Sequence, residues 1–143
     1  MGALTKDTIN TLIWIASLFL ISSHYDGKAQ VADSIIRSIS NELSPKIKAD
    51  TLNTLGFDLV FNNPSEARIL FNESIQFADA IKYQVGIAKA RKNIAISYDI
   101  QGRSNDAIRF YLDALKIYET LHDSIGISKI KNNIGIAYKN LNE

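Results

Sequence analysis

Asparagine and lysine side chains carry the chemistry that this sequence offers. The segment Asn-Ile-Ala-Ile-Ser-Tyr begins at Asn93, and its copy Asn-Ile-Gly-Ile-Ala-Tyr begins 40 residues later at Asn133. An asparagine amide has both a donor and an acceptor, so it can hold a peptide backbone without reading its side chains. Lys89, Lys92 and Lys129 come shortly before these asparagines and add positive potential. Together they indicate recognition of a protein or an extended peptide, favouring an acidic segment or a C-terminal carboxylate.

Catalysis and metal binding find little support among the other polar residues. His122, Asp123 and Ser124 are the residue types of a hydrolytic triad, but adjacent residues rarely take up triad geometry. The sequence shows no Gly-rich phosphate loop and no clustered metal ligands, and it contains no Cys. We therefore expect no catalytic residue, no metal site and no cofactor, and we do not expect an enzyme.

The composition is that of one ordinary globular domain. The chain has 143 residues, of which 46% are hydrophobic and 22% are charged. Its 16 basic and 15 acidic residues leave a net charge of +1, which argues against a nucleic-acid-binding protein. Only 2 Pro and 7 Gly are present, which suits helices better than a turn-rich β fold.

Residues 1–29 have the layout of a secretory signal peptide. Lys6 supplies a short basic region, residues 12–21 form an apolar run, and Gly27 and Ala29 are small residues before a cleavage after Ala29. Cleavage after Ser23 is the second choice. Two alternatives stay open: the segment is retained as a membrane anchor over residues 8–23, or it belongs to the fold. A span needs about 20 apolar residues, more than this run has. We expect export, to a periplasmic or extracellular location, with membrane attachment only if the segment is retained.

Apolar residues after position 29 recur at helical spacing and predict six helices. Proline follows a capping residue at Ser44-Pro45 and at Asn63-Pro64, where its missing N–H is harmless. Glu66 stands three residues after Asn63, as in a capping box. Gly102 is predicted to stop a helix, and Ser104 or Asn105 to cap the next. The predicted helices cover residues 31–39, 46–61, 64–82, 85–100, 107–121 and 125–141.

The predicted helices form a repeat of about 40 residues. Ala67 and Ala107, Phe71 and Tyr111, and Gly86 and Gly126 each lie 40 positions apart. One hairpin cannot bury its apolar face alone, so we expect neighbouring hairpins to stack. The expected organisation after the signal peptide is a half unit over 30–44, units over 45–83 and 84–123, and a half unit over 124–143.

These units resemble the tetratricopeptide repeat (TPR), in the longer form found in kinesin light chains and in bacterial sensory and regulatory proteins. The family pattern of a large residue, Leu-Gly and Tyr on one helix, then Ala, an aromatic and Ala on the next, is matched here with departures at Leu59 and Ser74 and charged residues in the large slot. The resemblance implies an all-α fold, a right-handed helix-hairpin solenoid of about six helices. The matching positions are Leu52, Leu55, Gly56, Ala67 and Phe71 in the first unit, Ile94, Ala95, Tyr98, Ala107, Tyr111 and Ala114 in the second, and Ile134, Gly135 and Tyr138 in the third.

The resemblance also implies that the first helix of each hairpin lines a concave face. Asn93 and Asn133 occupy the slot of the asparagine ladder of some family members, but Ile96 stands where a full carboxylate clamp has Asn. A solvated helix face is the alternative to a ligand groove. The candidate binding residues are Asn53, Lys89, Lys92, Asn93, Lys129, Asn132 and Asn133.

The C-terminal residues raise a separate question, since the chain ends where a first helix should turn into a second. We expect either a terminal cap or the front of a longer array, and we expect Ile130, Ile134 and Ile136 to leave apolar surface uncovered. The predicted function is a peptide-binding or protein-binding module, which the resemblance places at the N-terminal, sensory part of a larger regulator. The alternative is a structural module that forms a homo-oligomer through this open end.

Overall fold

The described part of the chain is all-helical, as predicted. A computed structural model describes residues 30–39, 41 and 43–142, and within these it contains six α-helices and no strand. The predictions of a signal peptide over residues 1–29 and of an anchor over 8–23 lie outside the described residues. Among the described helices, none has the length and apolar character needed to cross a membrane. The helices are α2 (Gln30–Ser38), α3 (Pro45–Leu59), α4 (Pro64–Ala80), α5 (Gln84–Asp99), α6 (Ser104–Thr120) and α7 (Ser124–Leu141).

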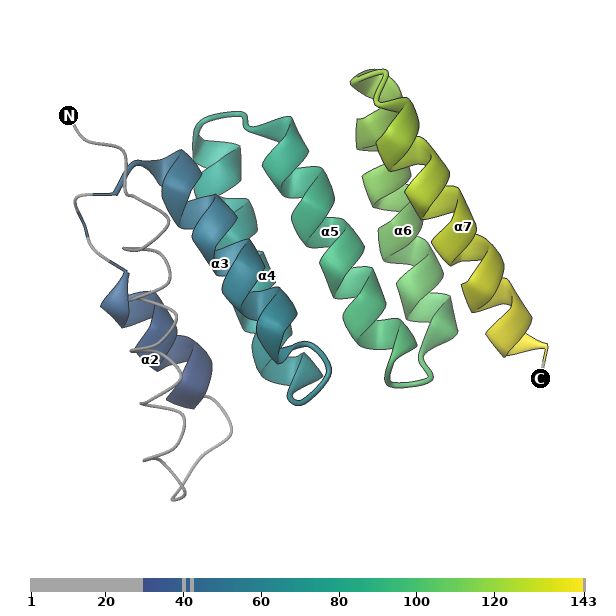
Figure 1. Ribbon diagram of the computed structural model, residues 1–143, viewed down its shortest axis with the longest axis horizontal. Coiled ribbons are helices and arrows are strands. Elements are labelled where there is room, and N and C mark those ends of the chain that lie inside the picture. The colour runs from purple at the N-terminus through teal and green to yellow at the C-terminus, as the bar shows by residue number, and fades with distance from the viewer. Residues whose placement is uncertain (1–29, 40, 42, 143) are drawn as a thin grey trace.

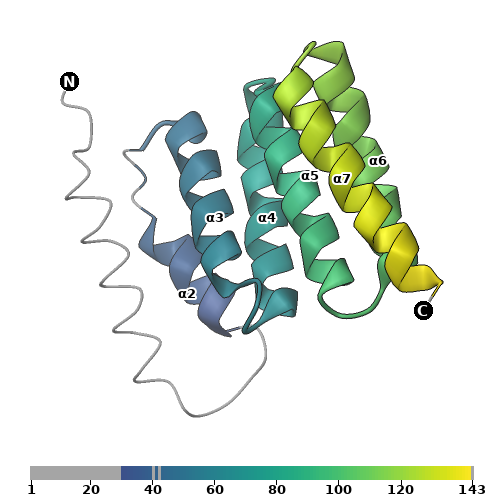
Figure 2. The same ribbon diagram turned by 45° about the vertical axis from the view of Figure 1, so that its right-hand side comes forward.

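Consecutive helices pack against one another in chain order. The pairs α3–α4 and α5–α6 are hairpins, α4 and α6 each also contact the helix that follows, and α2 packs on α4. In Figure 1, α3, α5 and α7 lie on the near side, with α4 and α6 behind them. Figure 2 shows the same order across the molecule after a turn of 45°. The first helix of each hairpin therefore contributes to one common face.

Local sequence signals set the starts of α3 and α4. The Ser44 hydroxyl accepts the Ile47 N–H at 3.4 Å, and the Asn63 amide oxygen accepts the Glu66 N–H at 3.4 Å. Pro45 and Pro64 each open their helix, as predicted. These side chains satisfy donors that the first helical turn leaves without partners.

The reciprocal half of the predicted capping box is wrong. Glu66 is buried, and its Oε2 accepts the Ala32 N–H at 2.8 Å instead of returning to Asn63. The Asn63 N–H bonds to the Leu59 carbonyl at 2.7 Å, so it offers nothing to Glu66. Glu66 thus serves the first turn of α2, where a carboxylate is favoured by the unpaired N–H groups.

The turns between helices use three residues in the left-handed region. Gly102 has φ 71°, which confirms it as the stop after α5. The predicted cap at Ser104 or Asn105 is wrong, because Ser104 already belongs to α6 and no side chain caps that helix. Lys82 and His122, which are 40 positions apart, have φ 55° and 53° in the turns before α5 and α7. The residue after each donates its N–H to the carbonyl of Ala78 or Tyr118, so the two turns are built alike.

In the core, small residues on one helix lie against aromatic residues on the next. A Cβ placed on Gly56 would lie 2.6 Å from Cε1 of Phe71, so the absence of a side chain at this position allows α4 to approach α3. Tyr111 and Tyr118 are buried in the cluster that joins α5, α6 and α7. One expectation at the C-terminal end is wrong, because Ile130 is fully buried rather than uncovered. Tyr138, which repeats the half-buried Tyr98, is 52% exposed.

Candidate functional site

The common face of α3, α5 and α7 is hollowed in two adjoining places. One hollow of about 220 Å³ lies between α5 and α7, and the other, of about 240 Å³, lies between α3 and α5. Both are lined by Asn53, Lys92 and Asn93, so they meet at these residues. Lys89 and Lys129 line the first hollow. We call the two hollows together the lysine groove.

Asn53 and Asn93 form the floor where the two hollows meet. Nδ2 of Asn93 donates to Oδ1 of Asn53 at 2.9 Å, which links α5 to α3. Their side chains are almost completely enclosed, with residue exposures of 8% for Asn53 and 5% for Asn93. Oδ1 of Asn93 is buried without a hydrogen-bond partner. A buried acceptor that lacks a donor costs about 1–3 kcal/mol, so this oxygen favours any ligand that brings an N–H.

Three lysines above this floor make the groove electropositive. The pKa of Lys92 is lowered, first by burial and then by the charges of Lys129 and Lys89. The smaller part of the shift comes from like charges, since Lys89 on α5 and Lys129 on α7 disfavour the charged form of Lys92. Asp123 lines the same hollow, but its Oδ1 accepts the Gly126 N–H at 2.9 Å as the cap of α7. The three ammonium groups therefore lack carboxylate partners among the described residues.

The hollow toward α3 has a different lining. Phe57 and Asp58 join Thr54 there, and Phe57 is exposed and packs edge-on against Phe61 with ring centroids 6.1 Å apart. Burial raises the pKa of Asp58. An occupant of the groove would thus meet positive charge toward α7 and an aromatic edge toward α3.

Two of the predicted site residues lie outside the groove. Asn132 is exposed and lines neither hollow. Asn133 is half-buried, and its side chain hydrogen-bonds to Tyr111, which lowers the Tyr111 pKa against the larger raising effect of burial. The structure thus brings together Asn53, Lys89, Lys92, Asn93 and Lys129, while Asn133 joins the core around α6.

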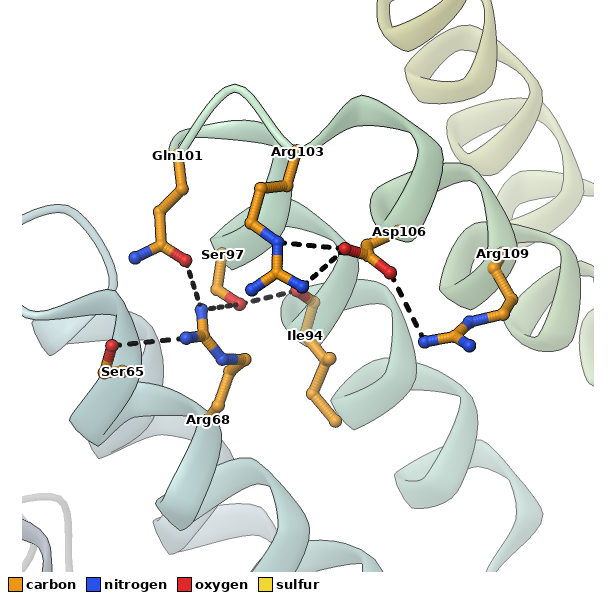
Figure 3. Close-up of polar contacts among 8 residues, drawn as sticks. All are labelled: Ser65, Arg68, Ile94, Ser97, Gln101, Arg103, Asp106 and Arg109. Carbon is orange, nitrogen blue, oxygen red and sulfur yellow. Dashed lines mark hydrogen bonds and ion pairs between the residues drawn. The ribbon is translucent and has the colours of Figure 1, made fainter.

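A second polar cluster, around Tyr98, was not predicted. The Arg68 guanidinium reaches from α4 to Gln101 Oε1 at 2.7 Å and to Ser97 Oγ at 3.3 Å, as Figure 3 shows. Both Arg68 and Arg103 also lie over the Tyr98 ring, at 4.5 and 4.6 Å from its centroid. Arg103 also bonds to Asp106 at 2.9 and 2.6 Å, so the cluster braces the turn between α5 and α6. Its contacts join residues about 30 positions apart, which no local spacing signals.

The described residues contain no group of three or more His, Cys, Asp or Glu that could hold a metal ion. His122 is exposed in its turn, and Asp123 next to it is engaged as a helix cap. Comparisons of the sequence with protein-family models and with curated proteins, and of the structure with solved structures, gave no match.

Proposed function

We propose that this chain is an exported, non-enzymatic binding module that holds an extended, acidic segment of another protein in the lysine groove. The observation that carries the proposal is the buried Oδ1 of Asn93, which lacks a donor on a residue that lines the same hollow as Lys89, Lys92 and Lys129. An extended backbone can donate an N–H to that oxygen. Carboxylate side chains of the same segment can meet the ammonium groups.

The architecture that we propose for this role is a TPR-like, right-handed solenoid. Its support is the 40-residue recurrence together with the packing of each helix from α3 to α6 on the helix that follows it. Such arrays use the face formed by the first helices of their hairpins as an extended binding surface. Placement at the sensory end of a larger regulator remains part of the proposal and rests on the resemblance alone.

Binding should depend strongly on charge. A ligand carboxylate relieves the repulsion among the three lysines, which adds to the larger effect of burial in lowering the Lys92 pKa. Such contacts weaken as salt increases, because the lysines are reached from solvent. A basic segment would add to the repulsion and should not bind.

The test uses the full chain and two eight-residue peptides, acetylated and amidated, in which Thr alternates with Glu or with Lys. Fluorescence anisotropy should show saturable binding of the Glu peptide only. Replacing Lys92 and Lys129 together by Gln should weaken it about fivefold or more, at about 0.2–1 kcal/mol for each exposed ion pair. Lys116→Gln on α6 is the control, because this exposed lysine lies outside the groove. Equal binding of the two peptides, or no effect of the double variant, would reject the proposal.

A second candidate function is self-assembly through α7. Its support is the exposed apolar side chains there, among them Ile125 at 68% exposure, Tyr138 and Leu141. Sedimentation velocity across a hundredfold range of concentration distinguishes the two candidates. A monomer at every concentration rejects assembly and leaves groove binding untouched.

Export has its own test. Intact-mass measurement of protein recovered from outside the cytoplasm should give a chain that begins at Gln30, or at His24 for the second cleavage choice. An intact Met1 terminus would reject the cleaved signal peptide and favour the anchor over residues 8–23.

A further inference from the structure

Helix α7 repeats α5, but no helix among the described residues covers it in the way that α6 covers α5. Four residues of α5 face α6, and all four are buried or half-buried. Their counterparts 40 positions later on α7 are all exposed, although the counterparts on the other side of the helix, such as Ile130, stay buried. We call these exposed residues the open stripe. The α5 residues are Ala88, Arg91, Ala95 and Tyr98, and the open stripe is Ser128, Lys131, Gly135 and Tyr138.

The way α6 covers α5 shows what such a stripe binds. Nη1 of Arg91 pairs with Oδ2 of Asp113 at 3.2 Å, and the Tyr98 ring stacks on Phe110 with centroids 5.4 Å apart. Ala95 lies in one cluster with Tyr111, so a small residue on α5 faces an aromatic on α6. The positive charge, the aromatic ring and the small residue on α5 are thus each matched by a group on α6, which covers them.

The open stripe keeps all three of these features. Lys131 retains the positive charge of Arg91, and it is exposed without an acidic partner among the described residues. Tyr138 retains the ring of Tyr98. A Cβ placed on Gly135 would meet nothing within 4 Å, whereas the same test at Gly56 in the first hairpin meets Phe71 at 2.6 Å. The stripe therefore has room for a large side chain on a helix that packs closely.

We infer that the open stripe docks an acidic amphipathic helix of a partner protein that presents the pattern of α6. In that pattern an aromatic precedes an acidic residue by three positions, as Phe110 precedes Asp113, and an Ala follows the acidic residue directly. The aromatic would stack on Tyr138, and the carboxylate would pair with Lys131. This surface is separate from the lysine groove, so the inference stands whether or not the groove binds a peptide.

A second copy of the chain suits this surface poorly. Helix α7 carries Lys129, Lys131 and Lys139 and no acidic residue, so two α7 helices would bring like charges together. The short helix α2 at the other end of the described fold exposes Asp33, Ser34, Arg37 and Ser38, a polar face without an aromatic. Charge complementarity thus favours a different chain with an acidic helix.

The test supplies α6 in trans as the probe. A labelled, acetylated peptide of residues 104–121 is titrated with the full chain and followed by fluorescence anisotropy. We expect saturable binding and a gain of helical circular dichroism, because an isolated helix of this length is marginal in water. Gly135→Gln should weaken binding at least tenfold, since its side chain fills the space that the docked aromatic needs. The matched control is Asn105→Gln in the full chain, at an exposed position of α6, and this variant should bind the peptide as the wild type does.

A charge swap distinguishes a specific ion pair from nonspecific association. Lys131→Glu in the chain should weaken its binding of the wild-type peptide about fivefold. A peptide with Asp113→Lys should bind this variant with the affinity restored. Thermal unfolding should show that Gly135→Gln is at least as stable as the wild type, because Gln is the better helix former. Absence of saturable binding, or binding indifferent to Gly135→Gln, overturns the inference. So does a dimer of the chain alone that Gly135→Gln converts to a monomer.

Discussion

Asn93 on α5 donates a hydrogen bond of 2.9 Å to Asn53 on α3, and this bond joins the first helices of two successive hairpins beneath the lysine groove. The pair leaves Oδ1 of Asn93 as a buried acceptor without a donor. One contact therefore ties the hairpins together and leaves one amide oxygen of the pair unsatisfied.

The Asn53–Asn93 bond should be measurable as a coupling. Asn93→Ala removes the donor and leaves Asn53 Oδ1 buried without it, at a cost of about 1–3 kcal/mol that is partly offset because the unpaired Asn93 Oδ1 is removed as well, so the free energy of unfolding in urea should fall by less than that cost. Asn53→Ala should have a smaller or similar effect. The double variant should lose less than the sum of the two single losses, because the second change no longer breaks the bond. Additive losses would show that the pair contributes nothing as a pair.

Lys92 should make stability rise with pH on the alkaline side of neutrality. Its folded pKa is below the ordinary value of 10.5, so between the two pKa values the unfolded chain binds more protons than the folded chain. The free energy of unfolding then increases as pH rises toward 10.5 through the folded pKa. Lys92→Gln should be more stable than the wild type at neutral pH, and the difference should shrink as pH rises.

Buried tyrosines act in the opposite direction at higher pH, so the comparison must be between variant and wild type. Burial raises the pKa of Tyr111 and of Tyr118, and stability from them is lost as pH rises above the ordinary tyrosine value of 10.0. This loss is common to both proteins and cancels. A constant difference between Lys92→Gln and wild type across the alkaline range would contradict the prediction.

Two glycines at equivalent places in the hairpins should respond oppositely to the same substitution. Gly56→Ala would place a Cβ 2.6 Å from Phe71, and overpacking of this kind destabilises by about 1–3 kcal/mol. Gly135→Ala meets no atom within 4 Å and should stabilise by up to about 1 kcal/mol through helix propensity. Urea unfolding of the two variants decides the matter, and a loss at Gly135 would mean that something already covers it.

Glu66 should hold α2 in place. Its buried Oε2 accepts the Ala32 N–H at 2.8 Å, so Glu66→Ala leaves that donor unsatisfied at a cost of about 1–3 kcal/mol. Hydrogen exchange should show faster exchange of the Ala32 amide, while amides of α5 and α6 keep their protection until global unfolding. The comparison variant is Glu73→Ala on the same helix, for which no hydrogen bond is seen. Unchanged exchange at Ala32 would exclude this role.

Features that depend on nearby residues were predictable from the sequence. Ser44-Pro45, Asn63-Pro64 and Gly102 each act within a few positions, and the helix boundaries they predict agree with the structure to within a few residues. The 40-residue recurrence likewise predicted repeated core positions, since Ala67 and Ala107 are both buried, as are Phe71 and Tyr111.

Features that depend on the meeting of distant residues were not predictable. When the repeats are aligned with Gly56 matched to Ala95, the counterpart of Asn93 is Thr54. The approach of α5 to α3 instead brings Asn53 opposite Asn93. A capping-box pattern predicted that Glu66 would bond locally, whereas its partner is 34 positions away. Asn133 matched Asn93 in sequence, yet its side chain bonds to Tyr111 of the core.

The like-built turns at Lys82 and His122 make the junctions between hairpins interchangeable. In each, a residue other than glycine takes a positive φ, and the next N–H bonds back to the same place in the preceding helix. The segment that follows one of these turns could therefore be attached after the other turn, because the two turns have the same backbone geometry. We expect that a duplicated segment of residues 83–122, inserted after His122, would give a protein one hairpin longer with every helix contact preserved. The length of this protein could thus be changed in steps of one hairpin.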